Sequence, residues 1–138
     1  MSAFELIRLV ADTGLFILVW IVQLVIYPGF AYLDSSDLKI WHPIYTRRIT
    51  LVVLPLMTAQ ITIGTIQLLQ LADTYNVISV SLIVATWLLT FIQFVPLHGK
   101  LDNAENPKLI VQSLVRKNWS RTVIWTVLFA MTVCQMMC

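Results

Sequence analysis

The sequence predicts an all-α protein: a four-helix transmembrane bundle with both termini on the same, outer side of the membrane. Of the 138 residues, 59% are hydrophobic and 12% are charged, against about 25% charged residues in an ordinary globular domain. The apolar residues form four runs near the length of about 20 residues that a spanning helix needs. The connections between them are short, which makes successive helices antiparallel neighbours. The length allows one domain, residues 1–138.

The first expected helix covers residues 3–32. Its apolar run is interrupted only by Gln23 and Pro28, and its length matches a full membrane span rather than the shorter core of a cleavable signal. Ser2 and Glu5 have the spacing of a capping box, in which each side chain bonds the backbone of the other. The helix is therefore expected to begin at the third residue.

The other three expected helices cover residues 42–71, 75–98 and 107–137. Gly99 follows the third apolar run and is a typical helix stop. Pro107 suits the first position of the fourth helix, because a proline there loses no intrahelical hydrogen bond.

Basic residues are distributed very unequally between the two ends of the expected bundle. Arg8 alone lies on the side of the termini. The first and third connections and the adjoining helix ends hold the other eight: Lys39, Arg47, Arg48, Lys100, Lys108, Arg116, Lys117 and Arg121. Because cytoplasmic loops are enriched in Lys and Arg, we expect this basic side to be cytoplasmic and the membrane to be a bacterial inner membrane.

The two halves of the sequence are weakly similar. "QLVIYPGF" from Gln23 resembles "QFVPLHGK" from Gln93, and "RRITLVVL" and "SRTVIWTVL" follow at similar spacings. Two helical hairpins in the same orientation would form a parallel repeat. Helix packing alone would also produce this similarity, so both interpretations stay open.

Polar residues of the second expected helix share one stripe. Because polar groups in hydrocarbon are costly, this stripe should face other helices or a wet cavity. Its members are His42, Thr46, Thr50, Val53, Met57, Gln60, Gly64 and Gln67. At the outer side, Glu5, Arg8 and Asp12 are spaced i, i+3 and i+7, which predicts an ion-pair ladder on one face of the first helix.

A candidate site is expected at the cytoplasmic end of the bundle. His42 begins the second helix and His98 ends the third, so both histidines of the chain come to the same level. Arg47 and Arg48 are about 100° apart on a helix, so we expect one to line the pocket and the other to reach the lipid headgroups. The candidate cofactor-binding residues are His42, His98, Arg47, Arg48, Lys100, Asn118, Trp119, Arg121, Trp87, Phe91 and Phe94.

Three functions are compatible with this cluster. The first is binding of a b-type haem, with His42 and His98 as metal ligands, aromatic side chains as walls and basic residues paired with the propionates. The second is a site, enzymatic or not, for an anionic lipid, a quinone or a small metabolite. The third is a non-catalytic membrane subunit or an oligomeric channel. No basic cluster interleaved with aromatic residues indicates nucleic-acid binding.

The pattern "QLVIYPGF", "WHPIYTRRIT", "PLHGKL" and "NWSRT" resembles small, uncharacterised four-helix bacterial membrane proteins. The resemblance covers most of the chain, and it implies the fold but no activity. We also expect self-association, with a dimer favoured, because Gln23, Thr126 and Thr132 are polar positions in a thin bundle.

Overall fold

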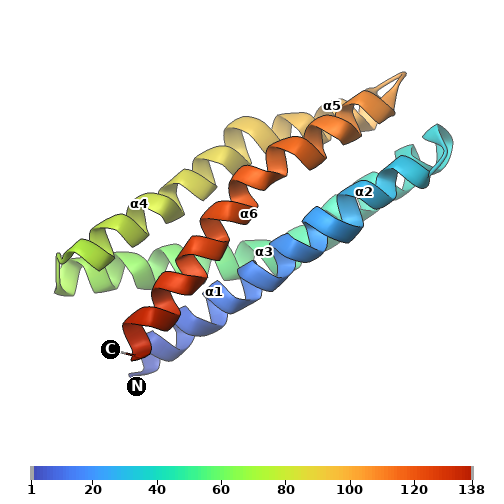
Figure 1. Cartoon of the computed structure of the whole chain (residues 1–138). Helices are drawn as coiled ribbons and strands as arrows, with labels where there is room; N and C mark the ends of the chain where they lie inside the picture. The colour runs from blue at the N-terminus through green and yellow to red at the C-terminus, as the bar shows by residue number, and fades with distance from the viewer. Residues whose placement is uncertain (1, 138) are drawn as a thin grey trace.

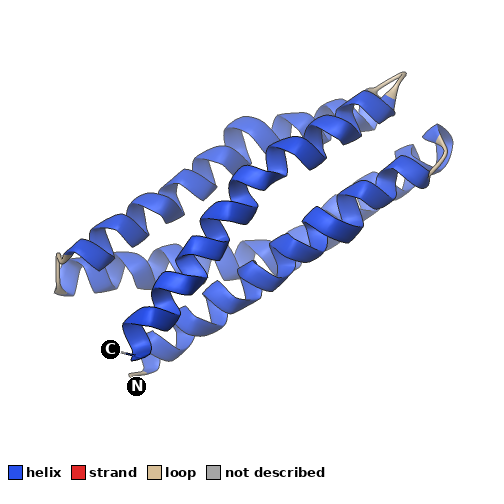
Figure 2. Cartoon of the chain, viewed as in Figure 1, coloured by secondary structure: helices blue, strands red, loops and turns tan. Residues whose placement is uncertain are grey.

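The computed structural model describes residues 2–137, which form four long helical rods joined by short connections (Figure 1, Figure 2). Each rod is long and apolar enough to cross a membrane. The rods are Ala3–Tyr32, Ser35–Gln70, Thr74–Asn103 and Pro107–Met137. The all-α four-helix bundle is thus confirmed, and the chain is an integral membrane protein.

Two of the rods are continuous α-helices, and two are interrupted by other helical turns. The second rod is α3 (Ser35–Gln70) and the fourth is α6 (Pro107–Met137). The first rod consists of α1 (Ala3–Ile21), the π-helical turn η1 (Val22–Ile26), α2 (Tyr27–Gly29) and the 3₁₀ turn η2 (Phe30–Tyr32). The third consists of α4 (Thr74–Leu89), the π-helical turn η3 (Thr90–Phe94) and α5 (Val95–Asn103).

The rods pack as a ring in which α1 contacts α3 and α6, and α4 also contacts α3 and α6. Both termini lie at one end of the bundle, together with the connection 71–73 (Figure 1). We call this the terminal end. The connections 33–34 and 104–106 lie at the opposite end, which we call the basic end.

Two helices extend further at the basic end than the sequence indicates. α3 begins at Ser35 rather than at residue 42, and α5 continues through Gly99 to Asn103. A glycine ends a helix by adopting a left-handed backbone. Among the described residues no glycine has a positive φ, so Gly99 continues the helix, and residues beyond it gain a defined face.

Each π-helical turn lies just before a proline. η1 ends two residues before Pro28, and η3 ends two residues before Pro96. Proline lacks the N–H that would bond the preceding turn, and a wider turn accommodates this loss. The first turn lies almost entirely in the first of the two similar sequence segments, and the second turn ends at the start of the other. The residues that follow them include Tyr27 and His98, which both line the interior of the basic end.

A buried ion pair joins the rods near the terminal end. Nε of Arg8 lies 2.7 Å from Oδ2 of Asp12, and each residue is only 1% exposed. Asp12 also accepts hydrogen bonds from Gln60 at 2.6 Å and Thr132 at 2.5 Å, so its carboxylate contacts α3 and α6 as well as α1. Gly64 makes room for the guanidinium, because a Cβ there would lie 3.1 Å from Nη1 of Arg8.

The sequence predicts a ladder of three charges on the first helix, but the ion pair of the structure joins only two of them, Arg8 and Asp12. Glu5 does not continue the pair. Its carboxylate accepts from the backbone N–H of Ser2 at 2.6 Å, while the Ser2 hydroxyl accepts from the backbone N–H of Glu5 at 3.2 Å. This is the capping box that the sequence indicates. Glu5 remains exposed, whereas Arg8 and Asp12 face the bundle interior.

We predict that Asp12→Ala strongly destabilises the bundle, because it leaves the Arg8 cation buried without a counter-charge. The expected loss is about 3–5 kcal/mol of unfolding free energy. Thermal or denaturant unfolding in detergent measures it. Glu5→Gln, which keeps an exposed acceptor, is the control and should change stability little. Equal stability of Asp12→Ala and the wild type would contradict the prediction.

Candidate functional site

The two histidines of the chain meet at the basic end. His42 on α3 is fully buried, and its Nε2 lies 2.8 Å from Nδ1 of His98 on α5. The rings are stacked, with their centroids 4.9 Å apart. The structure thus brings together residues that are 56 positions apart in the sequence.

The histidine pair is the centre of a longer chain of hydrogen bonds. Nδ1 of His42 lies 2.6 Å from a carboxylate oxygen of Asp102. On the other side, Nε2 of His98 lies 3.0 Å from the hydroxyl of Tyr27, and this hydroxyl accepts from Nη2 of Arg121 at 3.2 Å. Five side chains from α2, α3, α5 and α6 are joined in this way.

The two ends of this chain determine where its protons lie. Arg121 can only donate, so the hydroxyl of Tyr27 accepts from it and donates its own proton to Nε2 of His98. The ionised carboxylate of Asp102 can only accept, so His42 carries its proton on Nδ1. In the arrangement that we propose, His98 donates from Nδ1 to Nε2 of His42. In this arrangement every donor in the series points toward Asp102.

Arg121 is held in place by neutral groups. Its Nε and Nη2 donate to Oδ1 of Asn118 at 2.9 and 2.5 Å, and its Cζ lies 3.5 Å above the ring of Phe94. The amide of Asn118 donates to Gln23 at 3.0 Å, and Gln23 donates to the backbone carbonyl of Val115 at 3.1 Å. These partners fix the orientation of the guanidinium without neutralising it.

Arg121 has no anionic partner in the described part of the chain. It is 8% exposed, yet no carboxylate of residues 2–137 forms a salt bridge with it within 4.0 Å. Burial of a charge is costly unless an opposite charge compensates it. Arg8, the other buried arginine, has Asp12 for this purpose. The two arginines therefore differ in whether a carboxylate among the described residues compensates their charge.

A cavity of about 310 Å³ extends from Arg121 into the apolar part of the bundle. Its polar end is formed by Tyr27, His98 and Arg121, and most of its remaining lining is apolar. It reaches the outer surface between α3 and the η3–α5 segment, because Leu54 and Phe91 at its rim are 46% and 55% exposed. A spanning protein presents such a surface to lipid.

The cavity also contains an unsatisfied hydrogen-bond donor. Trp87 lines the cavity, and its indole N–H is buried without a partner among the described residues. Buried donors are nearly always paired in folded proteins. Nη1 of Arg121 likewise makes none of the hydrogen bonds that hold this side chain. Both groups belong to residues that line the cavity.

The structure brings together most, but not all, of the residues singled out from the sequence. His42, His98, Asn118, Arg121 and Phe94 are in contact through the hydrogen bonds and the cation–π contact described above. Trp87 and Phe91 line the cavity and stack on each other, with centroids 5.6 Å apart. The exposed residues that lie outside the site are Arg47, Arg48, Lys100 and Trp119.

The expectation that one of the adjacent arginines lines the pocket is not met, since both Arg47 and Arg48 are exposed. His42 defines the buried direction of α3 at this level. At about 100° per residue, Arg47 and Arg48 point roughly 140° and 120° away from it. Both side chains are therefore directed outward.

The sequence does not reveal that Tyr27 and Asp102 are hydrogen-bonded to the histidine pair. Asp102 is four residues after His98, a spacing that places both on one helical face. A helix that ends at Gly99 hides this signal, because Asp102 then lies outside the helix. The inward direction of Tyr27 follows a π-helical turn, which the sequence does not reveal.

The histidine pair does not fit axial ligation of a haem iron. Two imidazoles that share a metal hold their nitrogens about 4 Å apart, at roughly 2 Å per bond. The facing nitrogens of His42 and His98 are 2.8 Å apart, and the other two bond Asp102 and Tyr27. Among residues 2–137 no cluster of three or more His, Cys, Asp or Glu side chains could hold a metal ion.

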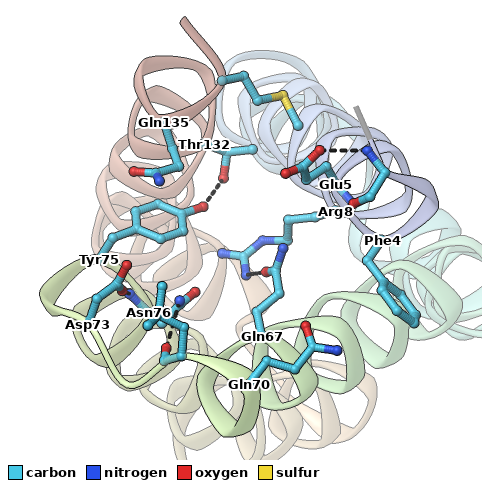
Figure 3. A pocket seen from close by; sticks show the side chains of 13 residues that line it. Phe4, Glu5, Arg8, Gln67, Gln70, Asp73, Tyr75, Asn76, Thr132 and Gln135 are labelled. Carbon is cyan, nitrogen blue, oxygen red and sulfur yellow. Dashed lines mark hydrogen bonds between the residues drawn. The ribbon is translucent and has the colours of Figure 1, made fainter. Parts of the chain in front are cut away.

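A second cavity, of about 410 Å³, opens at the terminal end. Figure 3 shows Arg8 and Gln67 at its centre and the hydroxyl of Tyr75 directed to Thr132, from which it is 3.1 Å away. The cation of this cavity is already compensated by Asp12. The cavity at the basic end is the one with an uncompensated charge.

Comparisons with family models, curated proteins and solved structures found no match to this chain. The function is therefore argued from the geometry of the site.

We predict that both histidines are neutral and carry their proton on Nδ1. Nitrogen-15 NMR of histidine-labelled protein in lipid nanodiscs at neutral pH distinguishes the two tautomers and the imidazolium. The chain contains only two histidines, so His98→Gln assigns both signals. An imidazolium signal, or a His98 protonated on Nε2, would contradict the hydrogen-bond direction given above.

Proposed function

We propose that this protein binds an amphipathic anion from the membrane, with a carboxylate or phosphate head at Arg121 and an apolar tail in the adjoining cavity. The observation that carries this proposal is the buried Arg121 cation, which has no carboxylate partner among residues 2–137 and lies at the polar end of an apolar cavity. An anionic head group would compensate a charge that the chain leaves uncompensated.

The depth of the site supports a ligand of this shape. The basic residues Arg47 and Arg48 indicate the membrane edge, and His42 lies about 9 Å beyond Arg48, at 1.5 Å per residue. In the opposite direction, Val53 and Met57 line the apolar part of the cavity. The head-group end thus lies at the level of lipid head groups, and the tail end lies at the level of hydrocarbon.

The available donors also favour an anion over the other candidate ligands. Arg121 and the unpaired indole N–H of Trp87 offer hydrogen bonds within one cavity. An uncharged quinone would satisfy such donors but would leave the cation uncompensated. Haem would require the histidine pair to separate and to lose both outer hydrogen bonds. We therefore favour the amphipathic anion over haem and quinone.

We further propose, from the distribution of Lys and Arg, that the basic end faces the cytoplasm of a bacterium. Self-association is not part of the proposal. Gln23 and Thr132 are at most 2% exposed, and Thr126 accepts from Trp20 at 3.1 Å. The polar side chains that suggested a dimer have partners inside one bundle.

Quenching of tryptophan fluorescence tests the binding proposal, because Trp87 and Trp125 line the cavity. The probe is 9,10-dibromostearic acid, added to the protein in nanodiscs of zwitterionic lipid. We predict saturable quenching whose apparent Kd rises by about tenfold or more in Arg121→Met, as expected for the loss of a hydrogen bond to a charged group.

Arg47→Met is the matched control, because it removes an exposed arginine from the same end, and it should change the apparent Kd less than twofold. The methyl ester of the probe should bind weakly, and a dibrominated phosphatidic acid tests phosphate against carboxylate as the head group. Non-saturable quenching of the wild type by both acids would overturn the proposal, as would equal affinities of the wild type and Arg121→Met.

A further inference from the structure

We propose that the side chains of Tyr27, His98, His42 and Asp102 form a proton relay from the cavity to water. The ligand would enter from the membrane as a neutral acid and would release its proton through this chain. Its anion would then remain beside Arg121. This inference rests on the proposed function, because it concerns an acid bound in that cavity.

The four hydrogen-bonded side chains connect the cavity with the water-exposed surface, which is what a proton relay must do. Tyr27 and His98 line the cavity, together with Arg121. At the opposite end, the side chain of Asp102 is 33% exposed, whereas that of His42 is completely buried. The intermediate distances are 3.0, 2.8 and 2.6 Å, all within hydrogen-bond range. Transfer among these four side chains requires neither a bridging water molecule nor a movement of the backbone.

The four side chains of the proposed relay have the chemistry that proton transfer needs. A phenol, two imidazoles and a carboxylate can each release and accept a proton. Asn118, which holds Arg121, and Gln23, which accepts from Asn118, are amides that cannot do this. A purely structural support of His42 would need neither a second imidazole nor an exposed carboxylate. Tyr45 also packs against the relay, with its ring centroid 6.2 Å from that of His42, and the exposed side chains of Lys39 and Lys100 are the neighbouring cations on α3 and α5.

The transfer is balanced and involves no redox change. The acid O–H of the ligand breaks as its proton passes to the oxygen of Tyr27, and the phenolic proton of Tyr27 passes to Nε2 of His98. The Nδ1 proton of His98 passes to Nε2 of His42, and the Nδ1 proton of His42 passes to the carboxylate of Asp102. Asp102, whose side chain is 33% exposed, then releases this proton to water, and a water molecule that donates to Nδ1 of His42 separates this nitrogen from the ionised carboxylate. The products are the ligand anion and two neutral imidazoles, now protonated on Nε2.

The same path returns the proton when the ligand leaves. A proton taken up by Asp102 moves in the opposite direction, restores both Nδ1 tautomers and neutralises the ligand anion. The neutral acid can then re-enter the lipid. Arg121 has a defined role in this cycle, because its cation lies 3.2 Å from the oxygen of Tyr27 and stabilises any negative charge that develops there.

Stopped-flow measurements with two signals test the relay. Tryptophan quenching by 9,10-dibromostearic acid reports binding, and a pH-sensitive dye in weakly buffered solution reports proton release. In the wild type we expect quenching and proton release to develop at the same rate. In Asp102→Asn we expect the apparent Kd to stay within twofold of the wild type while proton release slows by at least about tenfold, a general acid–base effect of ordinary size.

Asp102→Glu should restore most of the rate, because it returns a proton acceptor at the exposed end. His42→Gln should slow release as Asp102→Asn does. A dibrominated alkyl sulfonate, which carries no acid proton at neutral pH, should quench without proton release. Normal quenching with equally fast release in the wild type and Asp102→Asn would overturn the relay alone. Failure of saturable quenching in the wild type would overturn the proposed function.

Discussion

The burial of two guanidinium cations is the constraint on which the rest of this structure depends. A bundle of four apolar helices can hold such charges only if it surrounds them with compensating groups. Around Arg8 these groups are Asp12 and the hydroxyl of Ser79, which joins α4 to the ion pair. Around Arg121 they are an amide, a phenol and an aromatic ring. The polar side chains at both ends therefore determine how the rods are aligned, while the apolar clusters fill the space between them.

The two arginine sites are linked by one aromatic side chain. The indole N–H of Trp125 donates to Gln60 at 3.4 Å, and Gln60 donates to Asp12. The ring of the same tryptophan lies 5.8 Å from Cζ of Arg121 and lines the cavity. The ion pair at the terminal end thus also fixes one wall of the cavity at the basic end. A rigid wall is useful there, because a preformed cavity loses less conformational entropy when a ligand binds.

The fold could be predicted from the sequence, whereas the site could be predicted only in part. Apolar run length and short connections are sufficient for the bundle, and the polar stripe of α3 correctly places Gln60 and Gly64 inside it, whereas Thr50 of the same stripe is exposed. The positions of His42 and His98 at one level follow from antiparallel neighbours. Asp102 could not be assigned, because the backbone of Gly99 decides whether the helix continues. The burial of Arg121 without a carboxylate is a property of the packed bundle, which no local pattern in the sequence expresses.

The central claim is that the anion which compensates Arg121 comes from a ligand. Solid-state NMR dipolar recoupling between nitrogen-15 arginine side chains and palmitic acid labelled with carbon-13 at its carboxyl group tests this claim in lipid bilayers. Arg121→Lys provides the spectrum to subtract, since the chain contains other arginines. The account predicts a nitrogen–carbon distance of about 4 Å, as in a salt bridge, that disappears in the variant. Bound palmitate with no dipolar contact to Arg121 would contradict it.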